Sequence, residues 1–196
     1  GTDAGPAAEA RLATLAEEHE ATLIGPNSQG LIDLPRGLAA AFTPVLELED
    51  PLIGSLGFVT QSGAFGGAVT TILQENGVGL HNWIATGNEA ETGAAEILEE
   101  MCLDRDTSVI AGYVESIEDG RRLVDVRHRA AGRDTPIVLL KVGRSERGKA
   151  AVTSHTGKIA GEYRIYESIF RELGIIAVDD VDQLVDVVRA LDCGVT

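Results

Sequence analysis

Residues 52–67 read LIGSLGFVTQSGAFGG. An apolar run like the one over 52–60 is typical of a strand buried in a parallel sheet. The glycine-rich turn after it leads into a helix that we expect over 63–76, with Gly77 as its C-cap. A buried strand followed at once by a helix is the repeating unit of an α/β fold.

The same unit recurs toward the C-terminus. We expect further strands at 80–86, 108–114, 136–142 and 175–178, and further helices at 92–103, 119–131, 160–173 and 181–191. This strict alternation predicts an α/β domain with a doubly wound, flavodoxin-like, five-stranded parallel sheet. Ligands of such sheets bind outside the carboxyl ends of the strands, so the turns that follow the strands are where a site is expected.

The region before residue 52 is less regular. A helix is expected over 7–20, a short strand over 21–24 and a loop over 25–30. Residues 31–51 hold three prolines and no clear period, which indicates a connector. We therefore predict that residues 1–48 are the remnant of a preceding domain plus a connector, and that 49–196 form the flavodoxin-like domain.

Composition limits the class of protein. The chain has 196 residues, of which 44% are hydrophobic, enough for one sizeable core. Its net charge of −15 argues against nucleic acid and anionic membrane as partners. No apolar run approaches ~20 residues and no secretory signal is visible, so we expect a cytoplasmic protein. Cys102 and Cys193 lack metal-ligand spacing, and we expect two buried or half-buried thiols and no metal site.

Positive charge is concentrated in one short region. All three lysines of the chain lie within residues 141–158, with two arginines and His155, and with Glu146 as the only acid. In so acidic a chain this cluster indicates a bound polyanion such as phosphate or CoA. A chance cluster on a solvated loop is the alternative.

Two further turns carry candidate groups. The turn after residue 60 offers backbone N–H groups at a helix start and the hydroxyls of Thr60 and Ser62, which favour an anion. A capped helix without a ligand fits that turn equally well. Glu115 follows the strand at 108–114. It is either a solvated or capping acid, or a carboxylate that takes a proton from one histidine nitrogen and fixes its tautomer.

His155 stands in a setting unlike that of the other histidines. Small residues surround it, and a helix is expected directly afterwards. A neutral imidazole there can attack phosphorus, and the helix N-terminus can help hold the anion that results. The remaining histidines lack such a polar, glycine-rich setting, and we expect them on the surface: His19, His81 and His128.

Taken together, these motifs suggest a family. The chain carries Gly25-Pro26-Asn27-Ser28-Gln29-Gly30, Thr60-Gln61-Ser62-Gly63-Ala64, Gly87-Asn88, Tyr113-Val114-Glu115-Ser116 and Ser154-His155-Thr156-Gly157, in that order. It resembles the acyl-CoA synthetase (ADP-forming) family and, more distantly, the α subunit of succinyl-CoA synthetase. The likeness spans nearly the whole chain. After Gly87-Asn88 the family tends to have aspartates, whereas this chain has Glu89-Ala90-Glu91.

The resemblance implies roles for individual residues. His155 would be the phosphorylated histidine, and Glu115 the catalytic carboxylate that contacts it. The residues implied to bind phosphate are Thr60, Gln61, Ser62, Gly63, Ala64, Ser154, Thr156 and Gly157. Those implied to lie at the CoA site are Pro26, Asn27 and Ser28.

The resemblance also implies a reaction and partners. Acyl-CoA, phosphate and ADP would give the free acid, CoA and ATP, reversibly. The family binds ATP or ADP with Mg²⁺ on an ATP-grasp domain or β subunit, and it carries a complete Rossmann-type CoA-binding domain before the loop at 25–30. We expect both to be missing partners of this chain, within an oligomer that acts on a small carboxylic acid.

Two alternatives stay open at this point. Some relatives fuse this architecture to an acetyltransferase domain and use it as a regulatory, acyl-CoA-sensing module. A flavodoxin-like domain could instead bind a flavin or nicotinamide. The turn after residue 60 lacks G-x-G-x-x-G spacing, and aromatic residues are only 4% of the chain, which leaves little to stack on a flavin.

Overall fold

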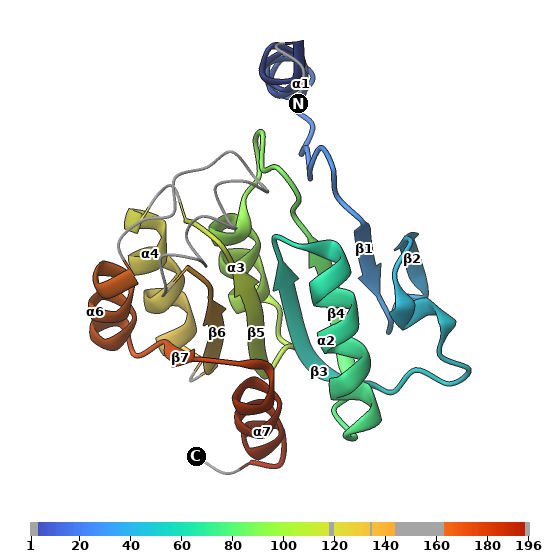
Figure 1. Ribbon diagram of the computed structural model, residues 1–196, viewed down its shortest axis with the longest axis vertical. Helices are drawn as coiled ribbons and strands as arrows, with labels where there is room; N and C mark the ends of the chain where they lie inside the picture. Colours follow the sequence, from blue (N-terminus) through green and yellow to red (C-terminus); the bar gives the residue numbers. More distant parts are fainter. Residues whose placement is uncertain (1–3, 118–119, 134, 144–162, 195–196) are drawn as a thin grey trace.

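The computed structural model describes residues 4–117, 120–133, 135–143 and 163–194 (Figure 1). One sheet of seven strands runs through it. The strands are β1 Gly30–Asp33, β2 Leu38–Ala41, β3 Ile53–Thr60, β4 Leu80–Ala85, β5 Val109–Val114, β6 Ile137–Lys141 and β7 Ile176–Val178. Their order across the sheet is β2-β1-β4-β3-β5-β6-β7.

Five of these strands form the predicted parallel sheet. In the order β4-β3-β5-β6-β7 every neighbouring pair is parallel. The second strand of this unit thus precedes the first, and the third, fourth and fifth follow, which is the flavodoxin-like order 2-1-3-4-5. The fold class expected from the sequence is confirmed, and each of these five strands ends within one residue of its predicted end.

Helices cover both faces of the sheet (Figure 1). They are α2 Gly63–Glu75, α3 Ala94–Leu103, α4 Gly120–Ala131, α6 Tyr163–Leu173 and α7 Val181–Asp192. Leu73 of α2 and Val188 of α7 pack into one core cluster. Leu98 of α3, Leu123 of α4 and Phe170 of α6 pack into the other. The two clusters lie on opposite faces, as expected when strands are buried on both sides.

The segment predicted to be a connector is instead part of the sheet. β1 and β2 pair antiparallel as a hairpin, and β1 also pairs antiparallel with β4. A 3-10 turn, η1 Pro44–Glu47, follows and buries Val45 completely. Each strand of the hairpin has four residues, too few for a hydrophobic period to show in the sequence. The division at residue 48 stays a prediction.

Three smaller predictions need correction. The strand expected over 21–24 is reduced to one bridge, between Ile24 and Thr92. The helix expected over 7–20 is present, but its bounds shift: it is α1, Ala4–Glu18, and it stands apart from the sheet in Figure 1. Cys102 is buried as expected, but Cys193 is exposed, because it follows the last residue of α7. Within the described part of the chain, no helix is long and apolar enough to cross a membrane.

Candidate functional site

The predicted site residues gather where β3, β5 and β6 end. Thr60 is in register with Tyr113, and Val114 is in register with Lys141, so the three strands finish at one edge of the sheet. The turns that leave them begin at Gln61, Glu115 and Val142. Ser154, His155, Thr156 and Gly157 lie outside the described residues, in the stretch 144–162 between β6 and α6. Their roles stay predictions.

Both polar atoms of the Gln61 side chain form hydrogen bonds within the protein. Its Oε1 accepts hydrogen bonds from the backbone N–H of Glu115 at 2.5 Å and of Ser116 at 3.0 Å. Its Nε2 donates to the carbonyl of Ser116 at 2.6 Å and to Glu89 Oε1 at 2.8 Å. The residue is 7% exposed. Its side chain therefore ties the turn after β3 to the turn that carries Glu115.

Thr60 and Ser62 shape the start of α2. The Thr60 hydroxyl donates to the Ser62 carbonyl at 2.7 Å and accepts from the Ser62 N–H at 3.2 Å. Ser62 is the N-cap of α2, and within the described structure its hydroxyl makes no capping hydrogen bond. The first backbone N–H groups of a helix have no intrahelical partner. Gly63 and Ala64 thus begin a helix whose N-terminus suits an anion.

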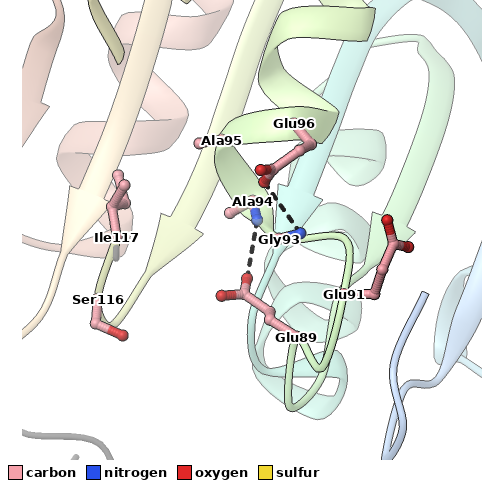
Figure 2. Close-up of a pocket in the computed structure, with 8 residues that line it drawn as sticks. All are labelled: Glu89, Glu91, Gly93, Ala94, Ala95, Glu96, Ser116 and Ile117. Atoms are coloured by element: carbon pink, nitrogen blue, oxygen red, sulfur yellow. Dashed lines mark hydrogen bonds between the residues drawn. The ribbon is translucent and has the colours of Figure 1, made fainter. Parts of the chain in front are cut away.

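The N-terminus of α3 differs from that of α2. Glu89 Oε1 accepts from the Ala94 N–H at 2.9 Å, and Glu96 Oε2 accepts from the Gly93 N–H at 3.1 Å (Figure 2). These carboxylates neutralise the positive end of the helix dipole. Gly93 is the N-cap residue of this helix. An anion at this edge of the sheet is therefore favoured at α2 rather than at α3.

Glu89 also belongs to the site, although its sequence motif predicts no role for it. Its Oε1 also accepts from the Thr86 hydroxyl at 2.7 Å and from Gln61. The residue has a left-handed backbone, with φ of 57°. Its place in the sequence could have predicted a capping role. An acid that follows a strand and lies five residues before a helix can accept from the first N–H groups of that helix.

A cavity of about 160 Å³ adjoins this network. It lies between the turn after β5 and the start of α3, and Figure 2 labels its lining. The lining residues are Glu89, Glu91, Gly93, Ala94, Ala95, Glu96, Ser116 and Ile117. Three glutamates make this cavity unsuited to a phosphate, which again directs an anion toward α2.

Glu115 is buried beside two other polar side chains. It is 4% exposed, and the Tyr113 hydroxyl lies 3.5 Å from its Oε1 as a hydrogen-bond donor. Burial, with the nearby Glu115 charge, raises the pKa of Tyr113. Burial lowers the pKa of Lys141 to about 8, and the Glu115 carboxylate opposes that shift. Glu115 is therefore a shielded carboxylate at the strand ends, as its predicted role requires.

Lys141, the one lysine of the predicted cationic cluster that lies among the described residues, is buried. Its Nζ donates to the Val142 carbonyl at 2.5 Å and lies 4.6 Å from the centre of the Tyr166 ring. Only 3% of Lys141 is exposed. The charge of Lys141 therefore acts on Glu115 inside the protein. Attraction of an anion from solvent would need other positive groups.

The loop predicted to bind CoA lies next to the phosphate turn. The Ser28 hydroxyl donates to the Ala85 carbonyl at 2.5 Å and accepts from the Gly30 N–H at 2.8 Å, which fixes the loop on β4. The exposed Asn27 donates from its Nδ2 to Asn88 Oδ1 at 3.1 Å. Pro26 accepts the Asn88 N–H at 2.9 Å through its carbonyl. The structure thus brings Pro26–Ser28 to the same edge as Thr60–Ala64 and Glu115.

His81 contradicts the prediction of a surface histidine. It is 3% exposed, and its Nε2 lies 2.7 Å from Asp104 Oδ2. Among the described residues, His81, Asp104 and Asp106 are the group that could hold a metal ion. Asp104 also accepts from the Asp106 N–H and the Thr107 hydroxyl. Its carboxylate is thus engaged in holding the turn after α3 against the start of β4, away from the strand ends.

Comparison with known proteins places this geometry in a family. Residues 53–191 match the model of the succinyl-CoA ligase like flavodoxin domain. The chain is 37% identical over 182 residues to acetate–CoA ligase [ADP-forming] I of Archaeoglobus fulgidus, covering 93% of this chain and 26% of that protein. It is 32% identical over 186 residues to the α subunit of acetate–CoA ligase [ADP-forming] II of Pyrococcus furiosus, covering 95% and 39%.

A solved structure agrees with these relatives. The dinucleotide-forming acetyl-coenzyme A synthetase 1 of Ca. Korarchaeum cryptofilum, in complex with phosphate and ADP, superposes with a TM-score of 0.85 at 35% identity. The match covers 94% of this chain and 39% of that one. The fold and the strand-end site therefore define an α/β domain of the CoA-ligase type. The chain belongs to the succinyl-CoA ligase-like flavodoxin family, and it spans well under half the length of these relatives.

Proposed function

We propose that this chain carries a phosphoryl group on His155 within an acyl-CoA synthetase of the ADP-forming kind. The proposed reaction converts acyl-CoA, phosphate and ADP to the free acid, CoA and ATP, and back. The observation that supports it best is the convergence of the α2 N-terminus and the buried Glu115 at the edge where β6 ends. The segment that contains His155 begins just beyond β6.

The proposed chemistry gives each group one task. One imidazole nitrogen of His155 attacks the phosphorus of an acyl phosphate, the bond from phosphorus to the acyl oxygen breaks, and the free acid leaves. Glu115 accepts a hydrogen bond from the other nitrogen, fixes the tautomer and stabilises the positive charge that develops. The N–H groups at Gly63 and Ala64 hold the phosphoryl oxygens. A helix end of this kind contributes about 0.3–1 kcal/mol, and up to ~2 kcal/mol when partly buried.

Other parts of the reaction need other domains or subunits. The relatives are much longer than this chain, and two of them are named as α subunits. We propose that an ATP-grasp domain or β subunit supplies ADP or ATP with Mg²⁺. A CoA-binding domain would complete the CoA site that Pro26, Asn27 and Ser28 begin. Because several relatives are named for acetate, a small carboxylic acid is the proposed substrate class.

Labelling of His155 tests this proposal. The protein, assembled with its nucleotide-binding partner, is incubated with Mg²⁺ and ATP that is labelled in the γ-phosphate. We expect a base-stable, acid-labile label on the parent, and no label on His155→Ala. Equal labelling of the two proteins would refute the proposed role. The chain alone should form no acyl-CoA, because we propose that ADP or ATP binds on an ATP-grasp domain or β subunit.

A further inference from the structure

We propose that Gln61 and Glu89 act together as a positioning pair that fixes the Glu115 turn for phosphoryl transfer. This inference rests on the proposed function. It assigns Gln61 to the support of a catalytic group rather than to phosphate, and it gives Glu89 a role that the family motifs do not provide.

The hydrogen bonds of Gln61 determine which way its amide points. Two backbone N–H groups, of Glu115 and Ser116, face Oε1. Two acceptors, the Ser116 carbonyl and Glu89 Oε1, face Nε2. A flipped amide would place donors against donors and acceptors against acceptors, so only one orientation satisfies all four contacts. The Gln61 side chain therefore hydrogen-bonds both the N–H and the C=O of Ser116, and also the N–H of Glu115.

Glu89 holds Gln61 in that orientation from the other side. The Glu89 Oε1 atom receives N–H and O–H donors from three places: Gln61, the Thr86 hydroxyl and the first backbone N–H of α3. The pair thus connects the ends of β3, β4 and β5 with the start of α3. The backbone of the Glu115 turn is held in this way, so we infer that its carboxylate is oriented before the reaction begins.

Replacing Gln61 with glutamate distinguishes a role in positioning Glu115 from a role in binding the substrate. The new side chain has the same shape, and one of its oxygens can still accept from Glu115 and Ser116. The other oxygen faces two acceptors, so as a carboxylate oxygen it is repelled by both, whereas with a proton it can donate to one of them. The neighbouring Glu89 carboxylate favours that protonation. The variant should therefore recover function as the pH falls.

Gln74 provides a matched control. It is also a buried glutamine, 6% exposed, with hydrogen bonds to backbone groups of Leu52 and Val78. It lies near the opposite end of α2, away from the strand ends. Gln74→Glu therefore places the same buried charge near the far end of α2 without touching the Glu115 turn.

The test measures the single-turnover rate of His155 phosphorylation and the KM for acyl-CoA in the assembled protein, at pH 6 and pH 8.5. For Gln61→Glu we expect a rate lowered by about 10- to 100-fold at pH 8.5, since small misplacements of a catalytic group cost this much. Most of the loss should disappear at pH 6, and KM should change little. Gln74→Glu should leave the rate within about threefold of the parent at both pH values, because it leaves the positioned carboxylate in place.

Hydrogen exchange gives a second readout that does not depend on turnover. In Gln61→Ala the amides of Glu115 and Ser116 lose their acceptor and should exchange faster, whereas in Gln74→Ala they should not. Unchanged exchange, an undiminished rate, or equal losses in both glutamate variants would overturn the proposal. If the parent itself shows no label on His155 while these amides respond as expected, the proposed function fails and the catalytic role of the pair falls with it.

Discussion

The side chain of Gln29 lies against Gly63 so closely that a β-carbon on Gly63 would sit 2.5 Å from Gln29 Cγ. Gly63 begins α2, and Gln29 belongs to the loop that is predicted to bind CoA. The contact therefore links the two halves of the candidate site through a position where only a glycine fits.

Gly63→Ala should force Gln29 away from the start of α2. Overpacking of this sort costs about 1–3 kcal/mol of unfolding free energy. Gly120→Ala is the control, because Gly120 also begins a helix and a β-carbon there meets nothing within 4 Å. Urea unfolding of both variants provides the comparison. Equal unfolding midpoints would show that the Gln29 contact is not as tight as the structure has it.

Ser28→Ala should loosen the predicted CoA loop. The variant loses the hydrogen bonds of Ser28 to Ala85 and Gly30, a loss of about 0.5–1.5 kcal/mol for each bond. The Gly30 amide should then exchange faster with solvent. Asn27→Ala removes a neighbouring side chain but leaves those bonds intact, so Gly30 should stay protected in it. If both variants exchange alike at Gly30, Ser28 does not anchor the loop.

Lys141→Met should change how stability depends on pH. Burial lowers the folded-state pKa of Lys141 to about 8, whereas the unfolded value is about 10.4. Between these values the unfolded chain binds more protons, so the parent gains stability as the pH rises through that window. The variant lacks this gain. Chemical denaturation at pH 7, 9 and 10.5 should show the parent improving relative to Lys141→Met, and a constant difference would contradict the buried, charged lysine.

The parallel core was predictable because apolar runs and helical segments alternate regularly from residue 52 onward. The buried run at 52–60 and its four repeats fixed the strand number, and the order then followed from the fold class. The hairpin of β1 and β2 escaped prediction because its four-residue strands are stabilised by pairing with β4, a tertiary effect. The burial of His81 was not predicted for a similar reason, since only the fold shows that Asp104 lies beside it.

The positions of the candidate site residues were predictable, but the hydrogen bonds that connect them were not. Thr60, Ser62 and Glu115 stand at strand ends, and their positions follow from the alternation of elements. The four hydrogen bonds of Gln61 do not, because they join turns that are 28 to 55 residues apart. The resemblance implies a phosphate contact for Gln61, which stays a prediction, and the fold adds hydrogen bonds from its side chain to Glu89, Glu115 and Ser116.

The most direct test of the central claim is a chase of the phosphorylated protein. The assembled protein is labelled on His155 from ATP, freed of nucleotide and mixed rapidly with ADP and Mg²⁺. If the phosphohistidine is an intermediate, the label should leave His155 and appear in ATP at least as fast as the overall reaction turns over. A label that stays on His155 while acyl-CoA, phosphate and ADP are still converted to ATP would contradict the account.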